Sequence, residues 1–494
     1  MELKAYNSFW DYLFESNDFT GDFLIGSENL NYLDIEKQTK LLSQILLTEC
    51  KSSLFVPIVS DNSSFFVIAY LSCHRANLIP VPIDPRASEE SYLEIVRQTK
   101  PEIAFIYSKY TDKIKNYFSN HTKIIDEKML QDIFTDSTDK KIEHVGVKSK
   151  NQPALLLYTS GSTGLPKGVM LSLENLISNS EAILKALPIE SSDIQEMVLP
   201  FFYSFGLSVL HTILRKKAKM VINNRFLFPS TVIKDIQDFK CTIFSGVPSH
   251  FQILAKKTDF LKTEMPSLRM LTQAGGRMPP SLALEIQNHF PEKKLYLMYG
   301  ATEATARLSV LDPKDLKTKA TTIGKPIEGV EFQIRKNSDK EDEGQLWVKG
   351  PGIMLGYFQD EAYTNQVIQD GWFYTGDLAK RDTDGFFTVS DRERDFIKSG
   401  GYRVSSKEVE DVIMHSPVVV EAAVVAMDDE LLGESILAYV VLKQSSDMKN
   451  AEQSIKDHCA ERLPPHKQPK NIRFLDTLPK NAAGKIIKVK LLNK

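Results

Sequence analysis

One short run of small and hydroxylated residues constrains this chain more than any other stretch. Residues 154–170 read ALLLYTSGSTGLPKGVM, an apolar segment, a loop and a second apolar segment. This pattern predicts a loop between two strands, with a helix that begins only near Ser172. Gly161 and Gly164 free the backbone to turn its N–H groups toward one point, where Lys167 adds a cation. The hydroxyl donors of the stretch are Thr159, Ser160, Ser162 and Thr163.

Many hydrogen-bond donors around one positive charge suit a polyphosphate ligand. The stretch is not a Walker A loop, because it contains no GxxxxGK(S/T) pattern. A Ser/Gly turn that binds nothing is the alternative interpretation of this stretch. The remaining motifs of the chain decide between the two.

Composition excludes several classes of protein. The 494 residues predict two to four domains, and 42% hydrophobic with 25% charged residues is typical of a globular protein. A net charge of −3 gives no electrostatic case for nucleic-acid binding. The four cysteines form no CxxC pair, so we expect neither a disulfide framework nor a zinc site. Without a signal-peptide pattern or an apolar run of ~20 residues, we expect a cytoplasmic protein with no membrane span.

Alternating strand and helix patterns predict an α/β fold. Residues 54–59 (LFVPIV) are typical of a buried strand, residues 65–76 (FFVIAYLSCHRA) of an apolar-faced helix, and residues 77–84 (NLIPVPID) of a second strand. This order predicts a βαβ unit with parallel strands. Residues 136–152 are polar and charged and are predicted to form a surface connector.

The string YTSGSTGLPKG resembles the phosphate-loop signature of the adenylate-forming (AMP-binding) superfamily. That superfamily includes acyl-CoA synthetases, stand-alone adenylation domains and firefly luciferase. The resemblance implies a large N-terminal α/β region of βαβ units with added β elements, followed by a small mobile α+β domain. The implied bounds are 1–391 for the AMP-binding domain, 392–396 for a hinge and 397–494 for the C-terminal domain.

Two further segments resemble nucleotide-contacting motifs of the superfamily. In LYLMYGATEA (295–304), the resemblance to YGxTE implies that Tyr299 stacks on adenine beside the turn at Gly300. It also implies that Thr302 contacts the α-phosphate and that Glu303 holds Mg²⁺, which agrees with the preference of this hard cation for carboxylate oxygen. LRMLTQAGG (268–276) resembles the adenine-contacting turn, which here contains Gly275 and Gly276.

The segment 370–404 carries the third set of motifs. Asp377 of YTGD resembles the residue that accepts both ribose hydroxyls, a role that suits a carboxylate with two oxygens. Arg392 resembles the arginine that contacts ribose or phosphate, although Asp391 stands where the family usually has glycine. Arg394 and Asp395 correspond to the hinge about which the small domain rotates between the two half-reactions.

Residues 197–214 correspond to the acyl-pocket segment of the superfamily, with Tyr203 and Phe205 as candidate pocket residues. Coenzyme A ligases often have histidine at the position of Tyr203, and amino-acid-activating domains have aspartate there. Tyrosine cannot neutralise an ammonium group, which disfavours an α-amino acid as the substrate. A half-buried core aromatic is the alternative role of Tyr203.

The C-terminal NAAG turn (481–484) is followed by Lys485, which resembles the catalytic lysine of the superfamily. Its ammonium group would contact the attacking carboxylate and the α-phosphate, and would offset the charge that builds up as two anions meet. The alternative is that Lys485 is one exposed lysine among several in this segment.

Together these features predict an AMP-forming acid–thiol ligase that uses ATP and Mg²⁺, with Lys485, Thr302 and Glu303 as its catalytic residues. A small-molecule carboxylic acid would be adenylated with release of pyrophosphate, and a thiol would then displace AMP. Because few residues follow Lys485, we expect the thiol to come from coenzyme A or from the phosphopantetheine of a separate acyl or peptidyl carrier protein. Coenzyme A is favoured. A non-catalytic homologue that binds a nucleotide or an acyl-adenylate is the alternative from another class.

Overall fold

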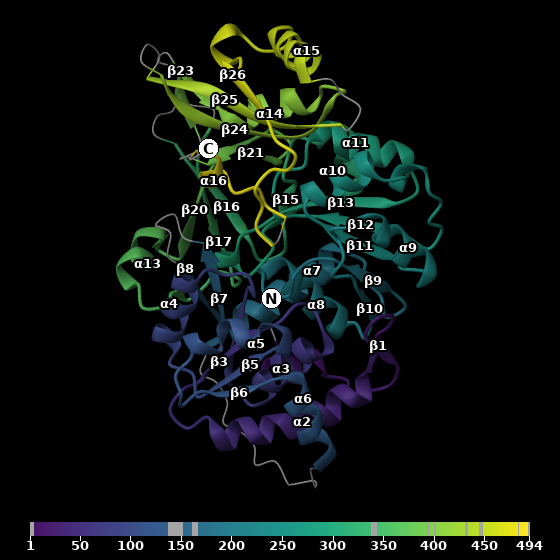
Figure 1. Cartoon of the computed structure of the whole chain (residues 1–494), viewed down its shortest axis with the longest axis vertical. Coiled ribbons are helices and arrows are strands. Elements are labelled where there is room, and N and C mark those ends of the chain that lie inside the picture. Colours follow the sequence, from purple (N-terminus) through teal and green to yellow (C-terminus); the bar gives the residue numbers. More distant parts are fainter. Residues whose placement is uncertain are drawn as a thin grey trace.

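The computed structural model describes residues 4–136, 152–160, 166–336, 343–392, 396–399, 402–429, 433–443, 448–482 and 484–492. In this part of the chain, strands and helices alternate through a large N-terminal region, and a smaller sheet with its own helices stands above it (Figure 1). This arrangement confirms the predicted α/β class. None of the helices in the described segments combines the length and apolar character needed to cross a bilayer.

A nine-stranded sheet forms the centre of the large region, in the order β15-β14-β13-β12-β11-β9-β10-β1-β2. Its pairs from β13 to β1 are parallel, and the pairs β1–β2, β13–β14 and β14–β15 at its edges are antiparallel. The strands are β1 (Asp22–Leu24), β2 (Leu30–Asn31), β9 (Ile194–Met197), β10 (Lys219–Ile222), β11 (Ile243–Gly246), β12 (Met270–Gln273), β13 (Lys294–Tyr299), β14 (Ser309–Leu311) and β15 (Lys325–Pro326).

A second, fully parallel sheet has the order β4-β3-β5-β6. Its strands are short apolar runs, as expected where helices cover both faces of a parallel sheet. Strand β3 pairs with β4 from Phe55↔Ile79 onward, with α3 between them, which confirms the predicted βαβ unit. The elements are β3 (Phe55–Val59), α3 (Ser64–Arg75), β4 (Ile79–Ile83), α4 (Glu89–Thr99), β5 (Ile103–Ile106), α5 (Ser108–Ile114), β6 (Lys123–Ile125) and α6 (Glu127–Asp136).

The segment 154–170 belongs to a small antiparallel sheet. Strands β7 (Pro153–Ser160) and β8 (Pro166–Ser172) pair with each other, and β18 (Gly356–Tyr357) pairs with β8. Helix α7 (Leu173–Ala186) follows, and Ser172 and Asn175 form a capping box at its start. These elements confirm that a second strand follows the loop and that the helix begins near Ser172.

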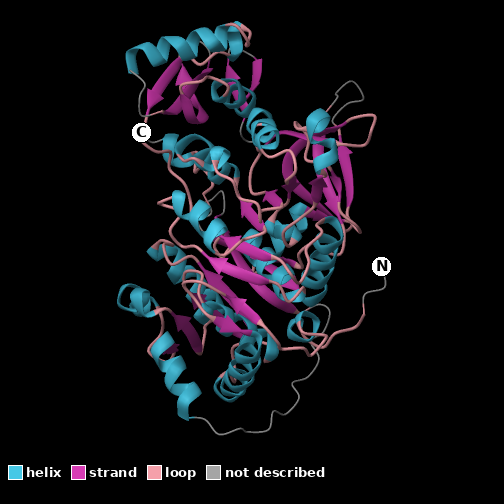
Figure 2. Cartoon of the chain, turned by 90° about the vertical axis from the view of Figure 1, so that its right-hand side faces the viewer, coloured by secondary structure: helices cyan, strands magenta, loops and turns pink. Residues whose placement is uncertain are grey.

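The remaining helices of the large region connect and cover its strands (Figure 2). They are α1 (Phe9–Leu13), α2 (Tyr32–Glu49), α8 (Ser204–Arg215), α9 (Ser230–Asp238), α10 (Pro248–Lys257), α11 (Pro280–His289), α12 (Leu316–Lys319) and α13 (Glu361–Val367). A five-stranded sheet lies toward the C-terminal unit and contains β16 (Glu331–Arg335), β17 (Gly344–Lys349), β19 (Ile368–Gln369), β20 (Trp372–Arg381) and β21 (Phe387–Arg392).

The C-terminal unit has its own hydrophobic core, built around Val409, Ile413, Val424 and Ile455. Figure 2 shows it as a separate cap on the rest of the chain. Its elements are β22 (Phe396–Ser399), β23 (Tyr402–Ser405), α14 (Ser406–Met414), β24 (Val419–Asp429), β25 (Gly433–Leu442), α15 (Met448–Ala460), β26 (Asn471–Phe474) and α16 (Val489–Leu492). The predicted domain bounds and hinge stay predictions, because residues 393–395 lie outside the described segments.

The C-terminal unit contacts the large region through a glycine turn and an ion pair. The Ser249 hydroxyl, at the start of α10, donates a hydrogen bond of 2.8 Å to the carbonyl of Gly484. The guanidinium group of Arg277 lies 3.1 Å from the carboxylate of Asp411 on α14. A Cβ atom at Gly484 would lie 3.0 Å from the side chains of both Ser249 and Val247. The turn therefore approaches α10 as closely as the absence of a side chain permits.

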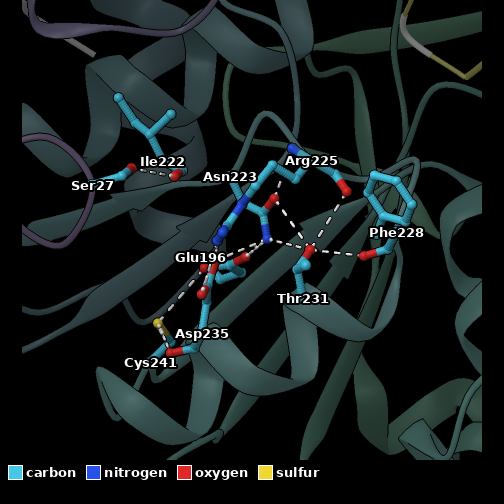
Figure 3. Close-up of polar contacts among 9 residues, drawn as sticks. All are labelled: Ser27, Glu196, Ile222, Asn223, Arg225, Phe228, Thr231, Asp235 and Cys241. Atoms are coloured by element: carbon cyan, nitrogen blue, oxygen red, sulfur yellow. Dashed lines mark hydrogen bonds and ion pairs between the residues drawn. The ribbon is translucent and has the colours of Figure 1, made fainter.

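A buried polar cluster fixes the end of β9, from which the chain runs toward Tyr203 (Figure 3). The amide of Asn223 donates to Glu196 at 3.1 Å and to Asp235 at 2.9 Å. Arg225 pairs with Asp235 at 3.2 Å. Glu196 is fully buried, and this burial, together with the nearby Asp235 carboxylate, raises its pKa well above the ordinary value.

Glu196→Gln is expected to stabilise the chain at alkaline pH. A carboxyl group whose pKa is raised by folding binds its proton more tightly in the folded chain, so its contribution to stability is largest below the unfolded pKa of ~4.3 and falls as pH rises. Glutamine can still accept the bond from Asn223 and cannot ionise. Thermal midpoints should therefore be higher for Glu196→Gln at pH 8, with a smaller difference at pH 5.5. The exposed Glu190→Gln is the control, and parallel pH profiles for wild type and Glu196→Gln would contradict the prediction.

Gly484→Ala is expected to loosen the contact between the C-terminal unit and α10. Gly484 has φ +76°, and Gly21, with φ +85° and no atom within 4 Å of the place that a Cβ would take, is a matched control for the backbone strain. Hydrogen–deuterium exchange should rise over residues 247–250 in Gly484→Ala and stay unchanged in Gly21→Ala. Equal exchange in the two variants would mean that crowding at this turn does not hold the units together.

Candidate active site

Two predicted nucleotide-binding residues from distant motifs meet directly. Tyr299 is the last residue of β13, and Asp377 lies on β20. The Tyr299 hydroxyl donates a hydrogen bond of 2.5 Å to the Asp377 carboxylate, which is largely buried. Arg392 pairs with Asp377 through the backbone register of β20 and β21, and nothing beyond this backbone pairing is described for it. The fold therefore brings together the predicted adenine-stacking and ribose-binding residues.

The predicted phosphate-contacting and metal-binding residues lie just after this tyrosine. A Cβ atom at Gly300 would lie 1.7 Å from the carbonyl oxygen of Ala306, so only glycine fits this tight turn. Thr302 begins the short turn that follows, and its hydroxyl is 3.0 Å from that of Ser204 at the start of α8. The Glu303 carboxylate accepts a hydrogen bond of 2.9 Å from the hydroxyl of Tyr357.

The backbone after Glu303 is strained. Thr305 has φ +67°, a value that is unusual for a β-branched residue. Its hydroxyl donates a hydrogen bond of 2.7 Å to the carbonyl of Gly352, which holds the turn in this shape. The strain lies between the residues predicted to contact ATP and the next strand, β14. Such strain is typical of segments whose geometry serves a function.

Glu303 is the predicted magnesium ligand, and its surroundings fit a metal that is held mainly by phosphate oxygens. Within the described segments, no group of three or more His, Cys, Asp or Glu side chains could hold a metal ion. Mg²⁺ commonly binds one or two carboxylates and takes its other ligands from water and substrate phosphates. A single oriented carboxylate next to Thr302 agrees with that kind of site.

Lys167 lies next to the Glu303 site. Its ammonium nitrogen is 3.1 Å from the ring centroid of Tyr363 and 5.4 Å from that of Tyr357. Thr159 lies beside it on β7, with its hydroxyl 3.5 Å from the carbonyl of Lys167. Residues 161–165 lie outside the described segments, and these include Gly161, Ser162, Thr163 and Gly164; for Ser160 only the backbone pairing with Pro166 is described.

One valine touches both the predicted adenine-contacting turn and the glycine turn that precedes Lys485. A Cβ atom at Gly275 would lie 3.0 Å from Val247 Cγ1, and one at Gly484 would lie 3.0 Å from Val247 Cγ2. Gly276, the other glycine of the predicted adenine turn, packs on Pro248. The predicted adenine turn and the turn that precedes Lys485 therefore both pack against one side chain.

Lys485 follows this docked turn. Its backbone N–H donates a hydrogen bond of 2.9 Å to the side chain of Asn481, and its carbonyl accepts one of 2.8 Å from the backbone of Asn481. The neighbouring lysines are held within the C-terminal unit, since Lys480 pairs with Glu421 and Lys488 pairs with Glu410. Lys485 is exposed.

The candidate acyl-pocket residues lie at the start of α8. Tyr203 is mostly buried, and its hydroxyl donates to Asp84 at 3.2 Å. Burial raises the pKa of this phenol, with a further contribution from Asp84, so it remains neutral. The Cδ1 atom of Phe205 would lie 3.9 Å from a Cβ atom added at Gly275. The guanidinium carbon of Arg307 lies over the face of the same ring, 3.9 Å from its centroid.

Sequence motifs did not predict a role for four further residues of the site: Ser204, Val247, Arg307 and Tyr357. Only Arg307 carries a signal in the sequence, because a charged residue stands between the YGATE motif and the apolar strand β14. The other three become candidates only through contacts between segments far apart in the chain. The hinge candidates Arg394 and Asp395 lie outside the described residues.

Comparison with known proteins gives extensive matches. Residues 20–358 match the AMP-binding enzyme family, and residues 408–485 match the AMP-binding enzyme C-terminal domain. The 2-succinylbenzoate–CoA ligase of Bacillus licheniformis is 36% identical over 343 residues, which cover 68% of this chain and 69% of that protein.

Solved structures agree over almost the whole chain. The O-succinylbenzoate coenzyme A synthetase of Bacillus subtilis, in complex with ATP and magnesium ion, is 27% identical with a TM-score of 0.84, covering 98% of this chain and 99% of that one. An anthranilate CoA ligase in complex with anthranoyl-AMP is 22% identical and shares the fold, with a TM-score of 0.92 over 99% of this chain and 97% of that one. The predicted superfamily and the predicted enzyme class, an AMP-forming acid–thiol ligase, are confirmed by these relatives. The chain belongs to the AMP-binding enzyme family.

Proposed function

We propose that this chain activates a small carboxylic acid with ATP to give an acyl-adenylate and pyrophosphate, and then transfers the acyl group to coenzyme A. The observation that supports this most is the docking of the Gly484–Lys485 turn and Gly275 on the same side chain, Val247. In this proposal, that contact would bring the lysine of one unit near the predicted nucleotide-contacting turn of the other. Relatives named as CoA ligases support coenzyme A as the acceptor.

In the first half-reaction, a carboxylate oxygen of the acid attacks the α-phosphorus of ATP, and the bond to the pyrophosphate oxygen breaks. Tyr299 and Asp377 would hold adenine and ribose, and the Thr302 hydroxyl would donate to an α-phosphate oxygen. The Lys485 ammonium group would offset the negative charge that both reactants bring together. Magnesium, when bound at Glu303, supplies further charge neutralisation on the phosphates.

In the second half-reaction, the thiolate sulfur of coenzyme A attacks the acyl carbon and AMP leaves. Lys485 has no role in this step, so the C-terminal unit can rotate away from Val247. Before it rotates, the hydrogen bond from Ser249 and the ion pair of Arg277 with Asp411 have to break. Arg394 and Asp395 are the proposed hinge of that motion.

Lys485→Ala is expected to reduce acid-dependent ATP–pyrophosphate exchange by about 10²–10³-fold, as for loss of one charge-stabilising group. Lys490→Ala removes an exposed lysine of the same segment and should retain exchange. Full exchange in Lys485→Ala would contradict the role of this lysine. ATP binding without exchange, for every acid in a panel of aliphatic, aryl and amino acids, would instead favour a non-catalytic nucleotide-binding protein.

The acceptor is tested with the same enzyme by following thioester formation with coenzyme A and with phosphopantetheinylated carrier proteins. We expect thioester with coenzyme A. If a thioester formed only on a carrier protein, the acceptor would be the carrier protein and not coenzyme A. The proposed adenylation step would be unaffected.

Tyr357→Phe is expected to raise the Mg²⁺ concentration for half-maximal exchange by about 10-fold or more, because residues that orient a metal-bound carboxylate commonly contribute 10–100-fold to metal affinity. The lost hydroxyl is the one that donates to Glu303. Tyr363→Phe is the control, since its ring also lies against Lys167. An unchanged Mg²⁺ requirement in Tyr357→Phe would contradict a role in metal binding for the hydrogen bond between Tyr357 and Glu303.

A further inference from the structure

A guanidinium group is buried next to the candidate acyl pocket. Arg307 is only 3% exposed, and its Nε donates to the sulfur of Met298 at 3.3 Å. Its guanidinium group lies on the ring of Phe205. Among the residues that the structure describes, no carboxylate lies within ion-pair distance of it. Burial lowers the pKa of Arg307 to about 9, which leaves the group charged at neutral pH.

Arg307 lines a small cavity whose other polar groups are neutral. The Thr272 hydroxyl donates to Ser245 at 2.8 Å, and Ser245 donates to Gln195 at 3.3 Å. Apolar side chains such as Val209 and Ile243 form the remaining walls. The cavity has a volume of about 20 Å³, which is room for a group about the size of one or two water molecules. The cavity therefore combines a fixed positive charge with little volume.

The cavity lies behind the predicted reaction centre. Phe205 contacts Arg307 on one side and Gly275 of the predicted adenine turn on the other. Ser204, one residue before Phe205, touches the hydroxyl of Thr302. A Cβ atom at Gly300 would lie 3.0 Å from the Cα atom of Arg307. A substrate whose reacting carboxylate lies at Thr302 could thus extend past Phe205 toward Arg307.

We propose that this cavity receives a second anionic group of the acid substrate, a carboxylate at the end opposite to the reacting one, so that the chain prefers dicarboxylic acids. This inference rests on the proposed function. A buried charge without a counter-charge is costly, and a carboxylate would supply both the counter-charge and acceptors for the N–H groups of the guanidinium fork. An alkyl end would leave the charge uncompensated, and an ammonium end would be repelled by it.

The test compares acids of equal length with and without the second carboxylate: succinate with butyrate, glutarate with pentanoate, adipate with hexanoate, and isophthalate with 3-methylbenzoate. For ATP–pyrophosphate exchange, we expect kcat/KM to favour one dicarboxylate over its partner by at least ~100-fold, as for a site whose polar groups lose their ligand. Arg307→Met keeps an unbranched side chain and removes the charge, and should bring the ratio below ~10-fold. Val209→Ala enlarges the same cavity without changing its charge and should keep the preference.

Thermal unfolding with each acid alone gives a readout that does not depend on turnover. The preferred dicarboxylate should raise the midpoint of the wild type and not that of Arg307→Met. The variant itself should fold at least as well as the wild type, because it loses a buried charge that lacks a counter-charge. Chloride and phosphate are included, since either could occupy the cavity as a free anion.

The outcomes separate this inference from the proposed function. Equal exchange with both members of every pair, or a preference that survives in Arg307→Met, would overturn the dicarboxylate and leave adenylation in place. Arg307-dependent stabilisation by dicarboxylates without exchange would keep the anion site and overturn the proposed reaction. The inference would also be overturned if chloride or phosphate stabilised the protein as strongly as every dicarboxylate. It would likewise be overturned if no dicarboxylate had an effect in either assay.

Discussion

The contact between Val247 and two glycine turns is the constraint on which the proposed chemistry depends. Lys485 belongs to a unit with its own core, and it reaches the large region through the turn at Gly484. Polar contacts across this junction include the hydrogen bond from Ser249 and the ion pair of Arg277 with Asp411. Each such interaction is worth about 1 kcal/mol or less when partly solvated. Contacts of this strength can position a lysine for one step and release it for the next.

Two ionisable groups, Glu196 and Arg307, are buried on opposite faces of strand β9, and they differ in how their charge is accommodated. Successive side chains of a strand point to opposite faces, so Gln195 lines the Arg307 cavity while Glu196 joins the cluster with Asn223 and Asp235. Glu196 can take up a proton, and its raised pKa shows that burial favours this neutral form. Arginine does not have that option at neutral pH. A buried carboxyl cluster can therefore be satisfied within the protein, whereas Arg307 needs an anion from outside.

Local patterns predicted the elements and the separate motifs, but not which of them would meet. The apolar runs of β3 and β4 with α3 between them predicted a parallel βαβ unit, because strand and helix periodicity is encoded over a few residues. YGATE and YTGD identified Tyr299 and Asp377 individually. Their hydrogen bond depends on two different sheets lying side by side, which no local pattern encodes. Val247 and Tyr357 were missed for the same reason, since an apolar residue and a tyrosine have no distinctive signal until their neighbours are known.

Arg307 and Lys485, the two cations of the proposed mechanism, differ in how they are held. Arg307 is fixed by burial, by stacking on Phe205 and by its bond to Met298, so it can recognise a group only at one distance from Thr302. Lys485 is exposed, on a turn of a unit with its own core. Charge interactions are stronger in the low-dielectric interior than at the surface, so the fixed cation is suited to selecting the substrate before reaction. In the proposed mechanism, the lysine adds its charge only while its unit is docked, so it would stabilise the transition state and not the bound acid.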